Sequence, residues 1–187
     1  MRQIISTIIL IISINLMTNA QEKLKIDTSK SAIKWTGEYT FYFGGHNGTI
    51  EFSQGYFIKT NDAISGGKFI IDMNTIVCLD IEDSEANKGL VNHLKDPDFF
   101  DVKNHDLAKI SITKVEYHDQ TSMRIEADMT IKGITLPINF QAKVDFSKKE
   151  MTTRFKIDRR RWDINYTSKM KNSAISDAIG FEVTLSL

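Results

Sequence analysis

The feature that most constrains the fold is a strict alternation of apolar and polar side chains in the second half of the chain. Apolar residues occupy every second position from Met123 to Ile131 and from Ile138 to Phe146, and the same period recurs from Phe181 to Leu187. Because successive side chains of a strand point to opposite faces, this period predicts strands with one dry and one solvated face. Such a pattern is typical of an antiparallel sheet that covers a single core.

Weaker versions of the same alternation raise the expected number of strands to about eight, at which a closed barrel can be filled by side chains or hold one small ligand. Turn-forming residues separate them, including residues 44–48 and a connection bracketed by Gly133 and Pro137. The predicted fold is therefore all-β, an eight-stranded antiparallel β-barrel. The weaker strands are expected at residues 33–37, 48–58, 66–73, 110–117 and 154–166.

Two places depart from regular strands. Ser84 is expected to cap a short helix that Pro97 ends, within a long crossover that lies over an end or edge of the barrel. Farther along, the apolar residues change from odd to even positions within residues 158–161, and a bulge or bend is expected there.

The first twenty residues differ from the rest of the chain. A basic start at Arg2 precedes an almost wholly apolar run that ends in Thr18, Asn19 and Ala20. This order is typical of a secretory signal peptide, and we expect cleavage after Ala20. An uncleaved membrane anchor is the alternative, but the run is shorter than the ~20 residues of a spanning helix. Residues 21–187 are then expected to form one exported, soluble domain of ordinary size.

Charge and cysteine content narrow the possible partners. The chain has 24 basic and 24 acidic residues, so no broad field would attract nucleic acid or an anionic membrane. Cys78 is the single cysteine, which rules out an internal disulfide, and a buried thiol is the expected state.

Catalytic and metal-binding motifs are not evident in the sequence. His46, His93, His105 and His118 match none of the short ligand spacings of zinc sites and fall on different predicted elements. Neither a nucleophile elbow nor a phosphate-binding glycine loop occurs. We therefore predict no metal, no cofactor and no enzymatic activity.

Several segments resemble the YceI-like family of exported bacterial lipid-binding proteins. The most specific match is His93–Val102, which resembles the family's helix-end signature of His-Leu-Lys followed by an acidic, doubly aromatic turn. Residues 104–108 carry no proline where the family commonly has one. Supporting matches, in family order, are residues 46–48, 129–135, 157–159 with Trp162, and 175–177.

The resemblance implies an extended, lipocalin-like barrel in the periplasm whose long apolar pore holds a polyisoprenoid or a similar amphiphile. It also makes a homodimer plausible. The sequence hypothesis is therefore non-catalytic binding, sequestration or transport of a polyisoprenoid, isoprenoid quinone or fatty-acid-like lipid. A self-packed barrel that acts as a stress-response or interaction module without cargo is the alternative.

Two sets of residues are candidates for ligand contact. Large apolar side chains on the inward-facing positions would line the cavity, although any single one of them could instead be ordinary core. Arg159, Arg160 and Arg161 could grip an anionic head group, or could form a solvated charged edge instead. The cavity-lining candidates are Trp35, Phe52, Phe69, Met129, Phe140, Phe155, Trp162 and Phe181.

Overall fold

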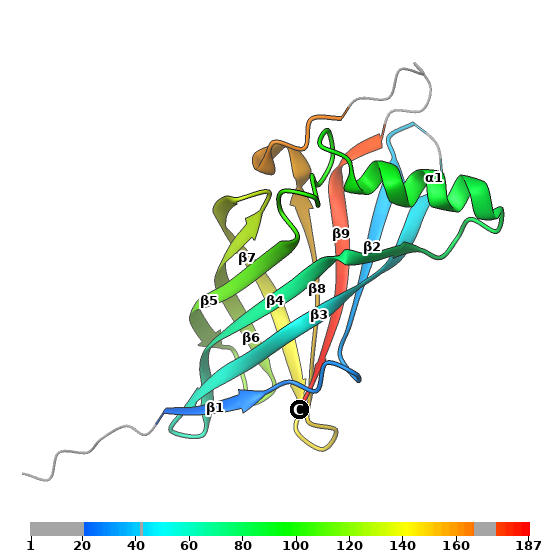
Figure 1. Cartoon of the computed structure of the whole chain (residues 1–187). Helices are drawn as coiled ribbons and strands as arrows, with labels where there is room; N and C mark the ends of the chain where they lie inside the picture. Colours follow the sequence, from blue (N-terminus) through cyan, green and yellow to red (C-terminus); the bar gives the residue numbers. More distant parts are fainter. Residues whose placement is uncertain (1–20, 42, 167–174) are drawn as a thin grey trace, which may run out of the picture.

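The strands of the computed structural model wrap into a closed barrel, with one helix lying across its upper end (Figure 1). The structure describes residues 21–41, 43–166 and 175–187, so the predicted signal peptide lies outside the described residues. The strands are β1 (Gln21–Lys25), β2 (Ala32–Tyr39), β3 (Gly45–Thr60), β4 (Ala63–Cys78), β5 (Leu107–Tyr117), β6 (Ser122–Ile131), β7 (Ile134–Asp145), β8 (Glu150–Asp158) and β9 (Ile175–Ser186).

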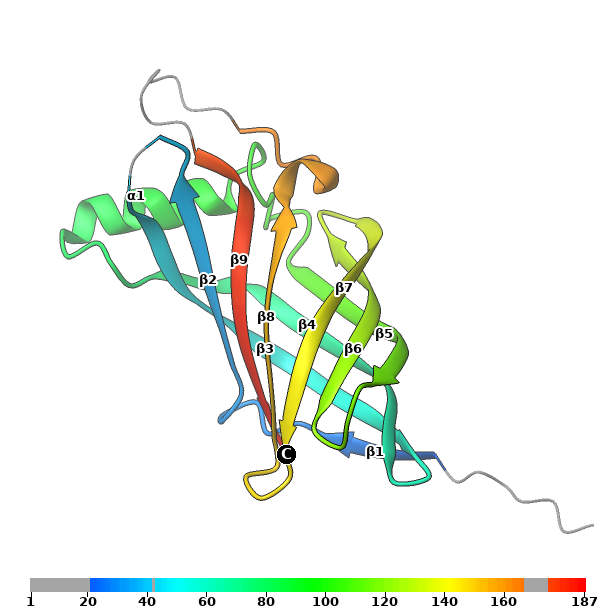
Figure 2. The same ribbon diagram turned by 180° about the vertical axis from the view of Figure 1, so that it is seen from behind.

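Eight strands close the barrel by antiparallel pairing, which confirms the predicted fold class. Their order is β3-β2-β9-β8-β7-β6-β5-β4, and pairing of β4 with β3 completes the circle. Seen from behind, β7, β8 and β9 form one wall of the barrel (Figure 2). The ninth strand, β1, was not predicted and pairs with the part of β3 that extends beyond β2.

The predicted alternation is clearest in β6, where every second residue from Met123 to Ile131 is buried. The prediction fails at the end of β7, because this strand stops at Asp145 and Phe146 is 64% exposed in the turn before β8. Pro137, predicted to bracket a turn, lies inside β7 instead. Lys132 and Gly133, both with positive φ, form the two-residue turn between β6 and β7.

Helix α1 (Ser84–Lys95) and the residues after it cover the upper end of the barrel (Figure 1). Asp83, rather than the predicted Ser84, is the N-cap residue, and its side chain accepts a hydrogen bond from the Ala86 N–H at 2.8 Å. Leu94 is the buried residue of the helix, and Phe99 and Phe100 follow it into the core. The crossover is therefore part of the barrel's closure.

The predicted strand over residues 154–166 is wrong beyond Asp158. The chain turns there into the 3₁₀ helix η1 (Arg159–Trp162), where the Asp158 side chain accepts a hydrogen bond from the Arg160 N–H. Asp163 ends it in the left-handed conformation, with φ at 56°. This turn is the bend predicted within residues 158–161, and it switches the chain's buried face and leaves Trp162 and Ile164 fully buried.

Gly48 is where the backbone of β3 approaches its surroundings most closely. A Cβ atom at this position would overlap the carbonyl oxygen of Val77 and the ring of Trp35. The ring of Trp35 thus occupies the space that a side chain would need, and its Nε1 donates to the Val77 carbonyl at 3.2 Å.

Candidate ligand-binding cavity

An apolar cavity of about 120 Å³ lies inside the barrel. Its wall takes side chains from all eight barrel strands, from α1 and from the crossover. Among these lining residues Thr153 is the only one with a hydroxyl, amide or charged side chain. Its Oγ1 donates to the Gln141 carbonyl at 2.6 Å, so the hydroxyl is already engaged. The cavity can therefore accept an apolar guest but offers it few polar partners.

Seven of the eight predicted lining residues lie along this wall, one on each of seven strands, and the rings from β8 and β9 are adjacent. They are Trp35, Phe52, Phe69, Met129, Phe140, Phe155 and Phe181. Trp162 does not line the cavity, because η1 carries it past the end of β8 against β6, where its Nε1 donates to the Met129 carbonyl at 3.2 Å. Contact of these residues with a ligand remains a prediction.

Sequence reasoning missed several aliphatic residues of the wall. Ile71 and Met73 continue the inward face of β4 after Phe69, and Ile110 and Ile112 form that of β5. Their alternation is visible in the sequence. Leu94, Phe99 and Phe100 close the upper end, which the spacing of the strands alone could not reveal.

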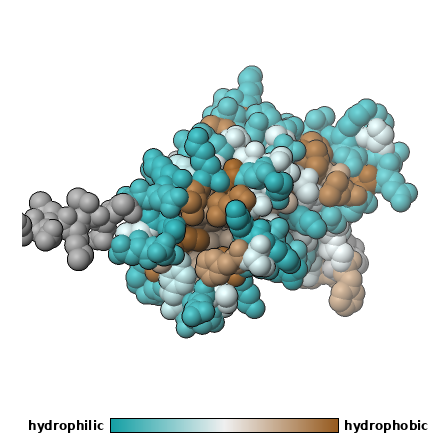
Figure 3. Space-filling model, turned by 90° about the horizontal axis from the view of Figure 1, so that it is seen from below, coloured by the Kyte–Doolittle hydropathy of each residue, from teal (hydrophilic) through white to brown (hydrophobic). Residues whose placement is uncertain are grey.

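A second cavity of about 280 Å³ opens at the lower end of the barrel. It combines charged residues, such as Lys59 and Lys149, with apolar ones. Phe57, Met151 and Leu185 line both this cavity and the inner one, so they lie between the two. Figure 3, viewed from this end, shows an apolar patch surrounded by hydrophilic residues.

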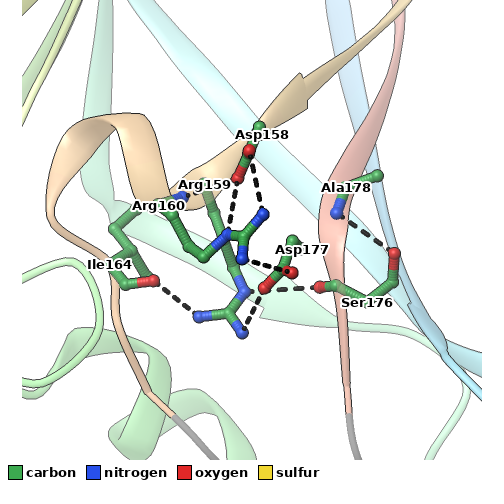
Figure 4. A network of polar contacts seen from close by, with 7 residues as sticks. All are labelled: Asp158, Arg159, Arg160, Ile164, Ser176, Asp177 and Ala178. Carbon is green, nitrogen blue, oxygen red and sulfur yellow. Dashed lines mark hydrogen bonds and ion pairs between the residues drawn. The ribbon is translucent and has the colours of Figure 1, made fainter.

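Arg159 turns inward and is almost completely buried, at 4% exposure. Its guanidinium donates to the Ile164 carbonyl at 2.5 Å and the Ser176 carbonyl at 3.3 Å, and forms an ion pair with Asp177 at 3.2 Å (Figure 4). Burial lowers the pKa of Arg159, and the Asp177 carboxylate opposes that effect. These bonds hold the start of β9 against η1.

The other two arginines are exposed. Arg160 bridges Asp158 and Asp177 at 3.3 and 3.2 Å, and its hydrogen bond lowers the pKa of Asp158 (Figure 4). Arg161 donates to the Pro137 carbonyl at 3.3 Å. None of the three lines the inner cavity, so contact with a head group stays a prediction.

The four histidines do not come together: each group of metal-binding donor atoms among the described residues contains at most one of them. His46 lies with Cys78 and Asp80 at the upper ends of β3 and β4. Burial favours a higher pKa for Asp80, but hydrogen bonds from the Asn47 N–H and His46 outweigh it and lower the pKa. The Cys78 thiol is buried as predicted, and burial raises its pKa.

His93 forms the other such group, with Asp96 and Asp98. Its ring packs edge-on against Tyr166, with the centroids 4.3 Å apart, and against Phe99 at 5.8 Å. The side chain thus joins α1 to the segment after η1. The rings of His46 and His93 both make contacts at the upper end of the barrel.

A closed antiparallel barrel around an apolar cavity defines a class of proteins that can enclose one small ligand. The sequence identifies the family within that class to which this chain belongs. Residues 24–187 match the family model described as the YceI-like domain, and the chain belongs to this family.

Solved structures share the fold. BcnA of Burkholderia cenocepacia superposes with a TM-score of 0.70 at 16% identity, covering 86% of this chain and 98% of BcnA. A mutant of the Campylobacter jejuni YceI protein gives a TM-score of 0.50 at 19% identity, covering 79% of this chain and 82% of that one. Curated protein sequences give no match. In the described residues, no helix is long and apolar enough to cross a membrane.

Proposed function

We propose that this protein binds a long apolar lipid in the barrel interior and sequesters or carries it without chemical change. The observation that supports this most directly is the cavity wall, in which Thr153 and Trp35 are the lining side chains able to donate a hydrogen bond, and both already donate to backbone carbonyls. An apolar chain loses no hydrogen bond when it enters such a space. The family supports the same reading, since YceI-like barrel proteins are generally binding proteins rather than enzymes.

Burial of apolar surface would supply the affinity. Each Å² of apolar surface removed from water contributes roughly 25 cal/mol, so a prenyl or acyl chain can bind without a specific hydrogen bond. The wall favours a slender, flexible chain over a rigid polar molecule. Polyisoprenoids, isoprenoid quinones and fatty-acid-like lipids all have this shape. The second cavity, with its charged residues, forms the lower mouth of the barrel and could solvate their polar ends.

The proposed setting is the periplasm. The family is typically exported, and residues 1–20 have the composition of a signal peptide. A protein with an apolar cavity and a solvated exterior is suited to carry a lipid through water. Whether the protein works as a homodimer would be decided by its mass in solution.

The competing proposal is a self-packed barrel that serves as an interaction module without cargo. Organic-solvent extraction of protein purified without detergent, followed by mass spectrometry, separates the two. We expect a stoichiometric lipid in the extract. Repeated preparations that contain no lipid would favour the interaction module.

A head-group role for the arginines is tested by exchanging them one at a time. Arg160→Gln and Arg161→Gln should fold normally because both side chains are exposed, whereas Arg159→Gln also perturbs a buried network. Unchanged lipid affinity in all three variants would dispose of this role.

A further inference from the structure

The wall of the barrel has a seam between β7 and β8 where the backbone is not continuously paired. β7 and β8 pair from Asp145 opposite Glu150 up to Ala142 opposite Thr153, and the ladder ends there. Above that point, residues 134–141 of β7 and 154–158 of β8 share no ladder pair in the part of the chain that the structure describes. The other neighbours of these strands stay paired, since β6 follows β7 to Ile134 and β9 follows β8 to Asp158.

Pro137 gives a local reason for this seam. Alternate residues of a strand direct their backbone groups to the same neighbour, and the carbonyls of Pro137 and Gln141 both accept hydrogen bonds from the β8 side. The backbone nitrogen of Pro137 is therefore directed toward β8, where strand pairing needs an N–H donor. Proline has no N–H to donate. On its β8 side the upper half of β7 is an edge strand within an otherwise closed barrel.

Side chains, rather than backbone bonds, hold the seam closed. The Thr153 hydroxyl donates to the Gln141 carbonyl at 2.6 Å, and the Arg161 guanidinium donates to the Pro137 carbonyl at 3.3 Å. Between these two bonds the ring of Phe140 stacks on that of Phe155, with centroids 4.8 Å apart and planes inclined by 18°.

The seam forms part of the cavity wall. Phe140 and Phe155 both line the inner cavity, and Phe181 follows Phe155 at 5.3 Å. All three rings are only partly buried, although they point to the inside of the barrel. Separation of Phe140 from Phe155 would thus open the apolar interior without breaking a ladder pair.

We propose that the β7–β8 seam is the lateral portal through which the apolar chain of the ligand enters and leaves, with Phe140 and Phe155 as its gate. This inference rests on the proposed lipid-binding function and adds the route of entry. In the described residues β4 and β5 also lack ladder pairs, between residues 63–66 and 113–117, but this gap lies at the lower end of the barrel. At the upper end, α1 with Phe99 and Phe100 covers the cavity. The lower mouth is the competing route.

Cross-linking across the seam tests the proposal. In a Cys78→Ser background, Asn139→Cys and Lys156→Cys place two outward-facing thiols on opposite sides of the seam, where a cleavable bis-maleimide cross-linker can join them. The probe is cis-parinaric acid, a fluorescent fatty acid, and the readouts are its rate of uptake and its affinity at equilibrium. We expect the cross-link to slow uptake by about tenfold or more, with full recovery after cleavage and little change in affinity.

The matched control joins β8 to β9, which are already paired, through Arg154→Cys and Glu182→Cys in the same background. This cross-link should leave the rate unchanged. An unchanged rate in the seam-linked protein would overturn the portal and favour the lower mouth. Failure of the uncross-linked protein to bind the probe would contradict the proposed function itself, and the portal with it.

Discussion

The ring of Phe140 on β7 lies nearly parallel to that of Phe155 on β8, with 4.8 Å between their centroids, at a level where the two strands no longer pair. Stacked aromatic pairs contribute about 0.5–1.5 kcal/mol beyond the burial of their surface. The contact is therefore strong enough to keep the wall closed and weak enough to be broken by thermal motion.

Replacing Phe140 by Ala should open this gate. Because the ring is only half-buried, we expect a loss of about 2 kcal/mol in the free energy of unfolding, below the 3–5 kcal/mol of a fully buried Phe→Ala change. Uptake and release of cis-parinaric acid should both become faster. Phe52→Ala enlarges the same cavity from β3, away from the seam, and should not raise either rate. Equal acceleration in both variants would show that cavity size, not the gate, controls exchange.

Filling the cavity should abolish binding while the barrel stays folded. Ala108 is buried and lines the cavity, and the next residue, Lys109, points outward from the same strand. Ala108→Phe is expected to weaken lipid affinity by roughly tenfold or more and to destabilise the protein by about 1–3 kcal/mol through overpacking. Lys109→Phe adds the same ring outside and should keep the affinity. Titration with the fluorescent probe measures both, and normal affinity in Ala108→Phe would place the guest elsewhere.

The buried arginine should matter for stability more than its exposed neighbour does. Arg159→Met leaves the Ile164 carbonyl without its donor and Asp177 without its buried partner. A cost of about 2–3 kcal/mol is expected from the lost charge-assisted bonds. Arg161→Met removes one exposed hydrogen bond and should change the free energy of unfolding by less than about 1 kcal/mol. Urea unfolding compares the two, and equal effects would contradict the role given to Arg159.

Gly48 should not tolerate a side chain. Gly48→Ala would force the ring of Trp35 or the backbone at Val77 to move, and we expect a loss of about 1–3 kcal/mol. Gly37, a glycine of the neighbouring strand β2, has open space around the position of a Cβ atom. Gly37→Ala should therefore be close to neutral. If Gly48→Ala leaves the thermal unfolding temperature unchanged, the ring of Trp35 is not held in place by its close packing against Gly48.

The turn between β5 and β6 should contribute stability that depends on pH. The N–H groups of Thr121 and Ser122 donate to Asp119 and lower its pKa from 3.8 to about 2. A lowered folded-state pKa gives stability that is complete above the unfolded value and is lost as the pH falls through the folded one. The advantage of the wild-type protein over Asp119→Asn should therefore shrink between pH 3.8 and about 2. If the difference in free energy of unfolding between the two proteins stays constant over this range, the stabilising role given to Asp119 would be contradicted.

Most of the barrel was predictable because its strands obey a period of two. The alternation in β6 is strict, and each apolar residue from Met123 to Ile131 is buried. β1 was missed since its five residues are mostly charged or polar and Leu24 alone packs against the core. The 3₁₀ helix was missed because the change of phase near Arg159 reveals that the chain turns, but not how.

The less predictable parts of the site depend on contacts between distant segments. His46 and Asp80 are 34 positions apart and meet because β3 and β4 lie side by side. Pro137 marks a turn when judged by composition, and its effect on pairing with β8 appears once the register is known. The lid of Phe99 and Phe100 depends on the direction of the crossover, which local periodicity does not encode.

Photo-cross-linking with a benzophenone-tagged isoprenoid alcohol tests the central claim most directly, since peptide mapping then reports which side chains touch the guest. We predict labels on inward-facing residues of the cavity, such as Phe69, Met129 and Phe181, and their loss in Ala108→Phe. Labels confined to the outer surface, or equal labelling of both proteins, would contradict binding inside the barrel.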